Sequence, residues 1–205
     1  MINTYIEIVL AMKVSKLLVL LERTMNSLVS VTASSFGGGR EQRANQVQIR
    51  NIKFTPAIQQ GILRVECETF SSTAGDGPYQ TVIQLNGVEF IDDSRYNFLQ
   101  SAEARDSAKY NTHMFTATDG NTYYASYDRA TSLDVKVRCT CKDFRWRFAY
   151  YNSGDDSLYG NPPPPYISQT DRPPANPNST PGVCKHLMRL KKELEKEEFF
   201  RALLN

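Results

Sequence analysis

The sequence feature that most constrains this chain is a pair of short motifs built from metal-binding residue types. Cys139 and Cys141 follow a run of alternating apolar and polar residues, which predicts the end of a strand. Cys184 and His186 directly precede the periodic run Leu187–Leu194, which predicts the start of a helix. Together the two motifs contain three of the four Cys and one of the two His in the chain. This concentration of rare residue types predicts one shared site.

The four side chains suit a closed zinc site. Two thiols at positions i and i+2 of a strand point to the same side, and the start of a helix can present two further ligands. Three thiolates and one imidazole form a tetrahedral shell of the structural type, with no position for water or substrate. We therefore predict a structural Zn²⁺ ion held by Cys139, Cys141, Cys184 and His186. The alternative, separate buried thiols with a solvent-facing His, leaves the clustering unexplained.

Residues 142–183 separate the two motifs, and much of this segment is rich in Pro. All but two of the ten Pro residues of the chain lie between Pro162 and Pro181. Pro fixes the backbone angle φ and removes a hydrogen-bond donor, so such a segment favours extended polyproline conformations over helix or sheet. We predict a long Pro-rich loop over residues 152–182, which is either a surface linker or a strap that binds a partner.

Aromatic and basic residues alternate directly after the first motif. Phe144, Trp146 and Phe148 alternate with two Arg residues, which predicts a strand with one aromatic and one cationic face. The aromatic face either packs over the metal site or offers a platform on which nucleic-acid bases stack. The candidate contacts to nucleic acid or to a protein partner are Arg138, Lys142, Arg145, Trp146, Arg147, Lys185 and Arg189.

The N-terminal stretch predicts an amphipathic helix over about residues 3–32, followed by a Gly-rich joint at 34–39. Its apolar residues recur at the three-and-four spacing of one helix face, as in Val14, Leu17, Leu18, Leu21, Met25 and Leu28. This helix either packs on its own domain or projects into a neighbouring subunit. Charged residues limit the longest apolar runs to Ile8–Met12 and Leu17–Leu21, which are too short for a membrane span or a secretory signal.

The middle of the chain alternates with the period of strands. The phase slips between Ile49 and Ile52, which predicts a β-bulge near Arg50 and Asn51. Cys67 shares its phase with the apolar residues of its strand, which predicts a buried structural thiol. The middle therefore predicts a small antiparallel sheet of about five to seven strands.

Turn residues in this region predict two hairpins. Asn86-Gly87 lies between two apolar runs, which is a strong hairpin signal. A second hairpin is predicted around Asp119–Asn121, and a short helix within residues 93–108. The predicted fold class is α+β. Its parts are an N-terminal helix and joint at 1–36, an antiparallel β domain at 40–135, and a zinc-stapled ββα-like module at 136–205.

The two motifs resemble a SWIM-type zinc finger over about residues 137–190. The residues that carry the resemblance are the Cys-x-Cys pair ending a strand and the Cys-x-His pair opening a helix. The resemblance implies a ββα zinc module that binds nucleic acid or protein, with these four residues as ligands. The long Pro-rich insert between the pairs departs from that pattern.

A longer stretch is similar to uncharacterised tailed-bacteriophage proteins that carry a SWIM-like end. The similar segments are Cys141–Tyr151, Arg172–Pro174, Asn176-Pro177 and Pro181–Leu187. This similarity implies a structural component of a virion, located in the virion or the host cytoplasm, whose partners are neighbouring proteins of an assembly.

The remaining sequence narrows the functional class. The formal net charge of +2 is too small for a globally basic nucleic-acid binder. No Ser/His/Asp set, no phosphate-binding Gly loop and no paired-carboxylate motif is present in the sequence. We therefore expect a non-enzymatic structural or assembly protein with no small-molecule substrate and no membrane contact. The alternative is a nucleic-acid-binding protein that uses the basic metal region and the aromatic strand.

Overall fold

The computed structural model describes residues 24–37, 39–71, 77–101, 110–128, 133–165, 167, 174–197, 200 and 204. Its helices are α2 (Met25–Phe36), α3 (Gly39–Ala44), α4 (Asp93–Gln100), α6 (Lys142–Arg147), α7 (Ala149–Gly154), α8 (Lys185–Leu194) and the 3₁₀ turn η1 (Ile58–Gln60). Its strands are β1 (Gln48–Ala57), β2 (Ile62–Phe70), β3 (Tyr79–Asn86), β4 (Glu89–Ile91), β5 (Tyr110–Thr116), β6 (Thr122–Asp128) and β7 (Val135–Cys139). Helices and antiparallel strands are both present, so the predicted α+β class is confirmed.

A four-stranded antiparallel sheet forms the centre of the molecule, with strand order β1-β2-β3-β7. Alternate residues of β2 point into the core, including Leu63, Val65 and Cys67, all fully buried or nearly so. The predicted buried position of Cys67 is confirmed. On β7 the same alternation buries Val137 and Cys139, which places the first predicted ligand on the core side of the sheet.

The predicted β-bulge is present in β1. The register between β1 and β2 shifts between Arg50 and Lys53. Asn51 adopts a φ of 55°, in the left-handed region that Asn tolerates better than most residues. The bulge explains why the apolar phase of this strand changes along the sequence.

The strands of the middle region form two sheets instead of the single predicted sheet. The second sheet has strand order β4-β6-β5. The predicted hairpin at Asn86-Gly87 is wrong, because β3 pairs with β2 and β7 whereas β4 pairs with β6. Both edges of β3 are already occupied, so the strand that follows the Asn-Gly turn has no free edge there and pairs elsewhere.

The other predicted hairpin and the short helix are confirmed. Thr116 pairs with Thr122 across the turn that joins β5 and β6. The carboxylate of Asp119 accepts hydrogen bonds from the Asn121 backbone N–H at 2.9 Å and from the Tyr123 hydroxyl at 2.6 Å. Helix α4 begins where the Asp92 side chain accepts a hydrogen bond from a backbone N–H of its first turn.

Helix α2 packs its Met25, Leu28 and Thr32 side chains into the core. It continues to Phe36, past the predicted end at 32, because no residue that breaks a helix occurs before Gly37, whose φ is 76°. Helix α3 then begins inside the predicted joint. The part of the predicted N-terminal helix before residue 24 lies outside the described residues.

The predicted aromatic strand after Cys141 is wrong, because this segment forms α6. The side chains of Phe144 and Phe148 are four residues apart, one helical turn, and both are buried. Trp146 lies off that face and is 47% exposed. The three aromatic residues therefore do not share one face, since a helix separates what a strand would align.

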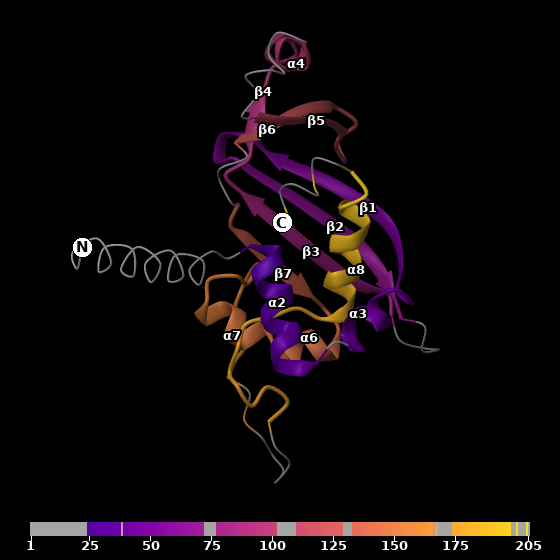
Figure 1. Cartoon of the computed structure of the whole chain (residues 1–205), viewed down its shortest axis with the longest axis vertical. Coiled ribbons are helices and arrows are strands. Elements are labelled where there is room, and N and C mark those ends of the chain that lie inside the picture. The colour runs from indigo at the N-terminus through magenta and orange to yellow at the C-terminus, as the bar shows by residue number, and fades with distance from the viewer. Residues whose placement is uncertain are drawn as a thin grey trace, which may run out of the picture.

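The helices are distributed unevenly around the two sheets. Helix α8 packs across β3 and β7, and α3 packs against α8. Figure 1 shows α2, α3, α6 and α7 gathered at one end of the four-stranded sheet, whereas the second sheet and α4 lie at the other end. None of the helices that the structure describes has the length and apolar character needed to cross a membrane.

Candidate metal centre

The structure brings the two sequence motifs together at one buried point. One potential ligand atom from each of Cys139, Cys141, Cys184 and His186 lies within 4.8 Å of every other. All four residues are buried, and the three Cys are free thiols. These side chains could therefore hold a metal ion.

The first pair of ligands is positioned by the end of the central sheet. Cys139 is the last residue of β7, and Thr140 continues the pairing with β3 through two hydrogen bonds to the backbone of Gln80, each 3.0 Å. Cys141 then caps α6, because its Sγ accepts the Phe144 backbone N–H at 3.3 Å. The Cys-x-Cys segment is thus held on both sides.

The second pair is positioned by the end of the Pro-rich segment. The Asn152 side-chain amide, fully buried, donates to the Gly182 carbonyl at 3.1 Å and accepts the Gly182 N–H at 2.8 Å. The Val183 N–H donates to the Thr32 hydroxyl at 2.9 Å. These hydrogen bonds position Cys184 at the start of α8, where it is the N-cap residue.

The two ring nitrogens of His186 differ in their surroundings. Its Nδ1 lies 3.9 Å from the Cys184 Sγ. Its buried Nε2 has no hydrogen-bond partner in the part of the chain that the structure describes. The Tyr79 ring packs against it with a centroid separation of 4.8 Å. With its Nδ1 beside the Cys184 thiol, the buried imidazole fits the role of a ligand.

The thiols differ in how readily they carry charge. Burial by itself raises the pKa of the Cys139 thiol, but hydrogen bonds to its sulfur from Cys141, Cys184 and Thr81 hold that pKa well below its usual range. Burial, together with the neighbouring sulfurs, raises the pKa of Cys184 well above its usual range. Without a cation, Cys139 therefore carries negative charge more readily than Cys184 does. A cation at the centre would stabilise all three as thiolates.

The fourth Cys is close in the sheet but is not a ligand. Cys67 pairs with Thr81, and Thr81 pairs with Cys139, so the three lie in one row across β2, β3 and β7. Burial, the charge on Cys139 and Glu68 raise the pKa of Cys67 to about 12. This thiol therefore stays protonated, which matches the predicted structural role.

Of the seven predicted contact residues, four are engaged within the protein. Arg138 donates to the Tyr159 and Asn161 carbonyls, which fixes the chain before the Pro run. Arg189 donates to the Val47 carbonyl at 3.1 Å and pairs with Glu193. Arg147 and Lys185 line a cavity described below.

The other three predicted contacts lie on the surface of α6. Lys142, Arg145 and Trp146 are exposed, and the Arg145 guanidinium lies 4.8 Å from the centroid of the Trp146 ring. Tyr150, on α7, is 40% exposed. We call Lys142, Arg145, Trp146 and Tyr150 the α6 surface.

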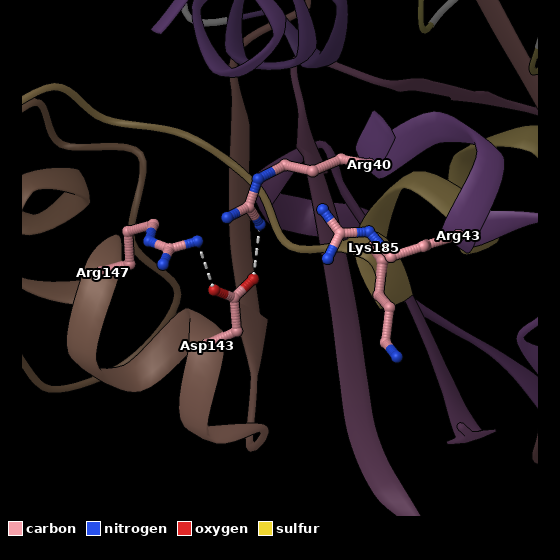
Figure 2. A pocket seen from close by; sticks show the side chains of 5 residues that line it. All are labelled: Arg40, Arg43, Asp143, Arg147 and Lys185. Atoms are coloured by element: carbon pink, nitrogen blue, oxygen red, sulfur yellow. Dashed lines mark hydrogen bonds and ion pairs between the residues drawn. The ribbon is translucent and has the colours of Figure 1, made fainter. Parts of the chain in front are cut away.

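The sequence reasoning missed two cationic residues near the metal centre. Arg40 and Arg43 on α3 line a cavity together with Asp143, Arg147 and Lys185 (Figure 2). The sequence carries no signal for this grouping, because Arg40 and Asp143 are 103 residues apart.

Comparison of the chain with protein-family models, curated proteins and solved structures gives no match. The resemblance to a SWIM-type zinc finger therefore stays a prediction from the motif.

Proposed function

We propose that the four-residue cluster holds one structural zinc ion. The observation that carries this proposal is the buried convergence of three thiols and one imidazole within 4.8 Å. Tetrahedral zinc bond lengths place two sulfurs about 3.8 Å apart, and sulfur and nitrogen about 3.5 Å apart. The Cys184 Sγ and the His186 Nδ1 are 3.9 Å apart, slightly more than the sulfur–nitrogen distance expected around zinc. Zinc would supply the dipositive charge that three buried thiolates require.

The ion would hold the start of α8 against the junction of β7 and α6, to which the chain otherwise connects it only through residues 142–183. Its ligands end β7, cap α6 and open α8. Closing the intervening loop costs roughly 3 kcal/mol by the logarithmic estimate, whereas structural zinc supplies about 10–16 kcal/mol in small peptides. Zinc would therefore stabilise this arrangement by more than the loop opposes it. With all four positions filled by protein, its role is structural.

The zinc proposal is tested by metal analysis of the purified chain. We expect one zinc per chain, reduced to near zero by His186→Ala or Cys139→Ser. Cys67→Ala is the matched control, because it removes a buried thiol that lies two strands from Cys139 in the same row of the sheet and outside the cluster. Unchanged zinc content in the His186→Ala protein would refute the ligand set, as would loss of zinc in the Cys67→Ala protein.

We further propose that the chain is a non-enzymatic structural or assembly protein that docks to other proteins. Support comes from the α6 surface, where Trp146, Tyr150 and Arg145 are residue types that dominate protein interfaces. Zinc would hold this surface rigid, because α6 begins at the ligand Cys141. Placement in a bacteriophage virion rests on the sequence resemblance alone.

The docking proposal is tested by assembly with the native neighbours of the chain. We expect Trp146→Ala to weaken that association at least about tenfold, as truncation of an aromatic interface residue commonly does. Ile58→Ala is a matched control, since Ile58 is 53% exposed on the 3₁₀ turn η1. Equal effects of the two substitutions, with zinc content intact, would contradict a docking role for this surface.

A second candidate function, nucleic-acid binding, is favoured by the exposed Lys142, Arg145 and Trp146. An exposed aromatic ring beside cationic groups suits base stacking and phosphate contact. Binding of single-stranded DNA or RNA should then fall linearly with salt on a log–log plot. Absence of binding at low salt for both nucleic acids would exclude this candidate.

A further inference from the structure

A cavity of about 280 Å³ lies beside the metal centre and is lined by four cationic side chains and one carboxylate. Arg40 and Arg43 come from α3, Asp143 and Arg147 from α6, and Lys185 from α8. Figure 2 shows the guanidinium groups of Arg40 and Arg147 flanking Asp143, with that of Arg43 beside Arg40. Four positive charges against one negative charge leave a local net charge of +3.

Arg40 forms the inner wall of this cavity. Its side chain is 9% exposed, and its guanidinium donates to the Asp143 carboxylate at 2.6 Å. The same guanidinium lies 5.3 Å from the Phe36 ring centroid and 5.5 Å from that of Phe148. Its Nε is buried and has no hydrogen-bond partner among the described residues. Arg40 is therefore a buried, oriented cation with donor capacity left over.

Asp143 cannot neutralise the other cations. Its two oxygens are already taken, one by Arg40 at 2.6 Å and one by Arg147 at 2.8 Å. Arg43 donates its Nε to the Gly39 carbonyl, and Lys185 donates to the Ser71 hydroxyl. Within the described residues neither Arg43 nor Lys185 pairs with a carboxylate. The excess positive charge faces a space large enough for a small anion.

We propose that this cavity binds a phosphate group, either inorganic phosphate or the phosphate of a small ester. Arg guanidinium groups match phosphate oxygens with paired, charge-assisted hydrogen bonds. A phosphate dianion neutralises more of the excess positive charge than a single carboxylate does. The cavity has room for a phosphate group, whereas a nucleic-acid backbone would require a series of such sites.

The cavity and the metal centre share their framework. Lys185 lies between the ligands Cys184 and His186, and α6, which carries Asp143 and Arg147, begins at Cys141. The cationic side chains themselves do not ligate the metal. Phosphate binding and zinc content are therefore measured separately on each variant, so that failure of one proposal is distinguishable from failure of the other.

The test is calorimetric titration of the full metal-loaded chain with inorganic phosphate in a phosphate-free buffer. We expect saturable binding at millimolar phosphate or below. Arg43→Gln should weaken it about tenfold, because one charge-assisted contact is lost. Asp143→Asn should strengthen it several-fold, because the carboxylate no longer competes for Arg40 and Arg147. The matched control is Arg145→Gln, an exposed Arg of the same helix outside the cavity, which should leave the affinity unchanged.

Opposite responses of the Arg43 and Asp143 variants distinguish a built site from general surface charge. Circular dichroism and zinc content confirm that each variant is folded. A nucleoside monophosphate is titrated in parallel. Tighter binding than that of inorganic phosphate indicates an ester ligand, and equal binding indicates free phosphate, and both support the site.

Three results would overturn the proposal. The first is absence of saturable phosphate binding to the folded, metal-loaded chain. The second is an equal loss of affinity in the Arg43→Gln and Arg145→Gln proteins. The third is binding of a single-stranded oligonucleotide without any binding of phosphate or nucleoside monophosphate, which would assign the charge to nucleic-acid binding instead.

Discussion

The two ends of the central sheet are stabilised in different ways. The metal end comprises the end of β7, α6, α7, residues 174–184 and the first turn of α8. The small-sheet end comprises β4, β5, β6 and α4. Side chains at the metal end contact residues far away in sequence, such as Val183 and Thr32, 151 residues apart. At the small-sheet end the Asp119 hydrogen bonds join residues two and four apart.

The two ends differ only in part of their burial, because Ala125 and Ser126 of the small sheet are fully buried while some large side chains at that end are exposed. At the metal end Phe144, Phe148 and Asn152 are at most 1% exposed. At the small-sheet end Phe98 is 62% exposed and Met114 is 51% exposed. Local turn hydrogen bonds support the β5–β6 hairpin, although Thr118 also donates to the Phe54 carbonyl of β1, whereas the metal end depends mainly on contacts between distant residues.

Metal removal should change the relative stability of the two ends more than any substitution described below. We expect a chelator to lower the stability of the metal end by several kcal/mol, because structural zinc supplies about 10–16 kcal/mol in small peptides. Amide hydrogen exchange should then accelerate in α6 and in the first turn of α8, while the β5–β6 hairpin keeps its protection. Uniform loss of protection throughout the molecule would show that the two ends are a single cooperative unit.

Gly182→Ala should cause the next largest loss of stability. A Cβ at this position would lie 2.5 Å from the Thr32 hydroxyl and 2.7 Å from an edge carbon of the Phe148 ring. Both neighbours are buried, so we expect a loss of about 2–3 kcal/mol in the free energy of unfolding. Urea denaturation measures the change.

Gly154→Ala is the control for this substitution. No atom lies within 4 Å of the added Cβ, and Gly154 belongs to the last turn of α7. We expect no destabilisation, because Ala is the better helix former. Similar losses from both substitutions would contradict the tight packing assigned to Gly182.

Phe98→Ser should change stability by no more than about 0.5 kcal/mol. Most of the Phe98 side chain is already in water, and exposed substitutions usually have effects of this size. The same urea denaturation applies. A loss above about 2 kcal/mol would mean that this side chain is covered in solution and that the small-sheet end is less open than it is here.

The smallest expected effect is a loosening of the β5–β6 turn at acidic pH. The Tyr123 hydroxyl, and then the Asn121 backbone N–H, hold the pKa of Asp119 below its ordinary value of 3.8. A depressed pKa stabilises the folded hairpin above the unfolded pKa, and this contribution is lost as pH falls through the folded pKa. NMR titration should therefore show the β5–β6 turn loosening only below about pH 4. Asp119→Asn should remove this pH dependence.

Sequence reasoning succeeded where the determinant is local. The β-bulge follows from a phase slip within one strand, and the β5–β6 hairpin follows from the turn residues around Gly120. The convergence of the four potential ligands was predicted because few residues of the right type exist. Helix α6 was missed because the spacing of Phe144, Trp146 and Phe148 also fits the period of a strand. In the structure the Cys141 cap and the burial of Phe144 and Phe148 on one side stabilise a helix instead.

Sequence reasoning failed where the determinant is a choice among distant partners. Strand β3 ends at Asn86, but the next strand, β4, pairs with β6, because β7 already occupies the edge of β3. Whether β7 or β4 takes that edge depends on the packing of the entire sheet. The same holds for the Arg40 contact with Asp143, which no local pattern indicates.

The amino-acid sequence by itself determined the identity of the four potential ligands, the α+β composition and the local turns, since these depend on residue type and short-range periodicity. Only the tertiary structure decided that the strands divide into two sheets, that α3 packs against α8, and that four cationic side chains and one carboxylate line one cavity. The physical reason is that a side chain's chemistry is set by its own atoms and near neighbours, whereas its partners are selected by the burial and pairing of the whole chain.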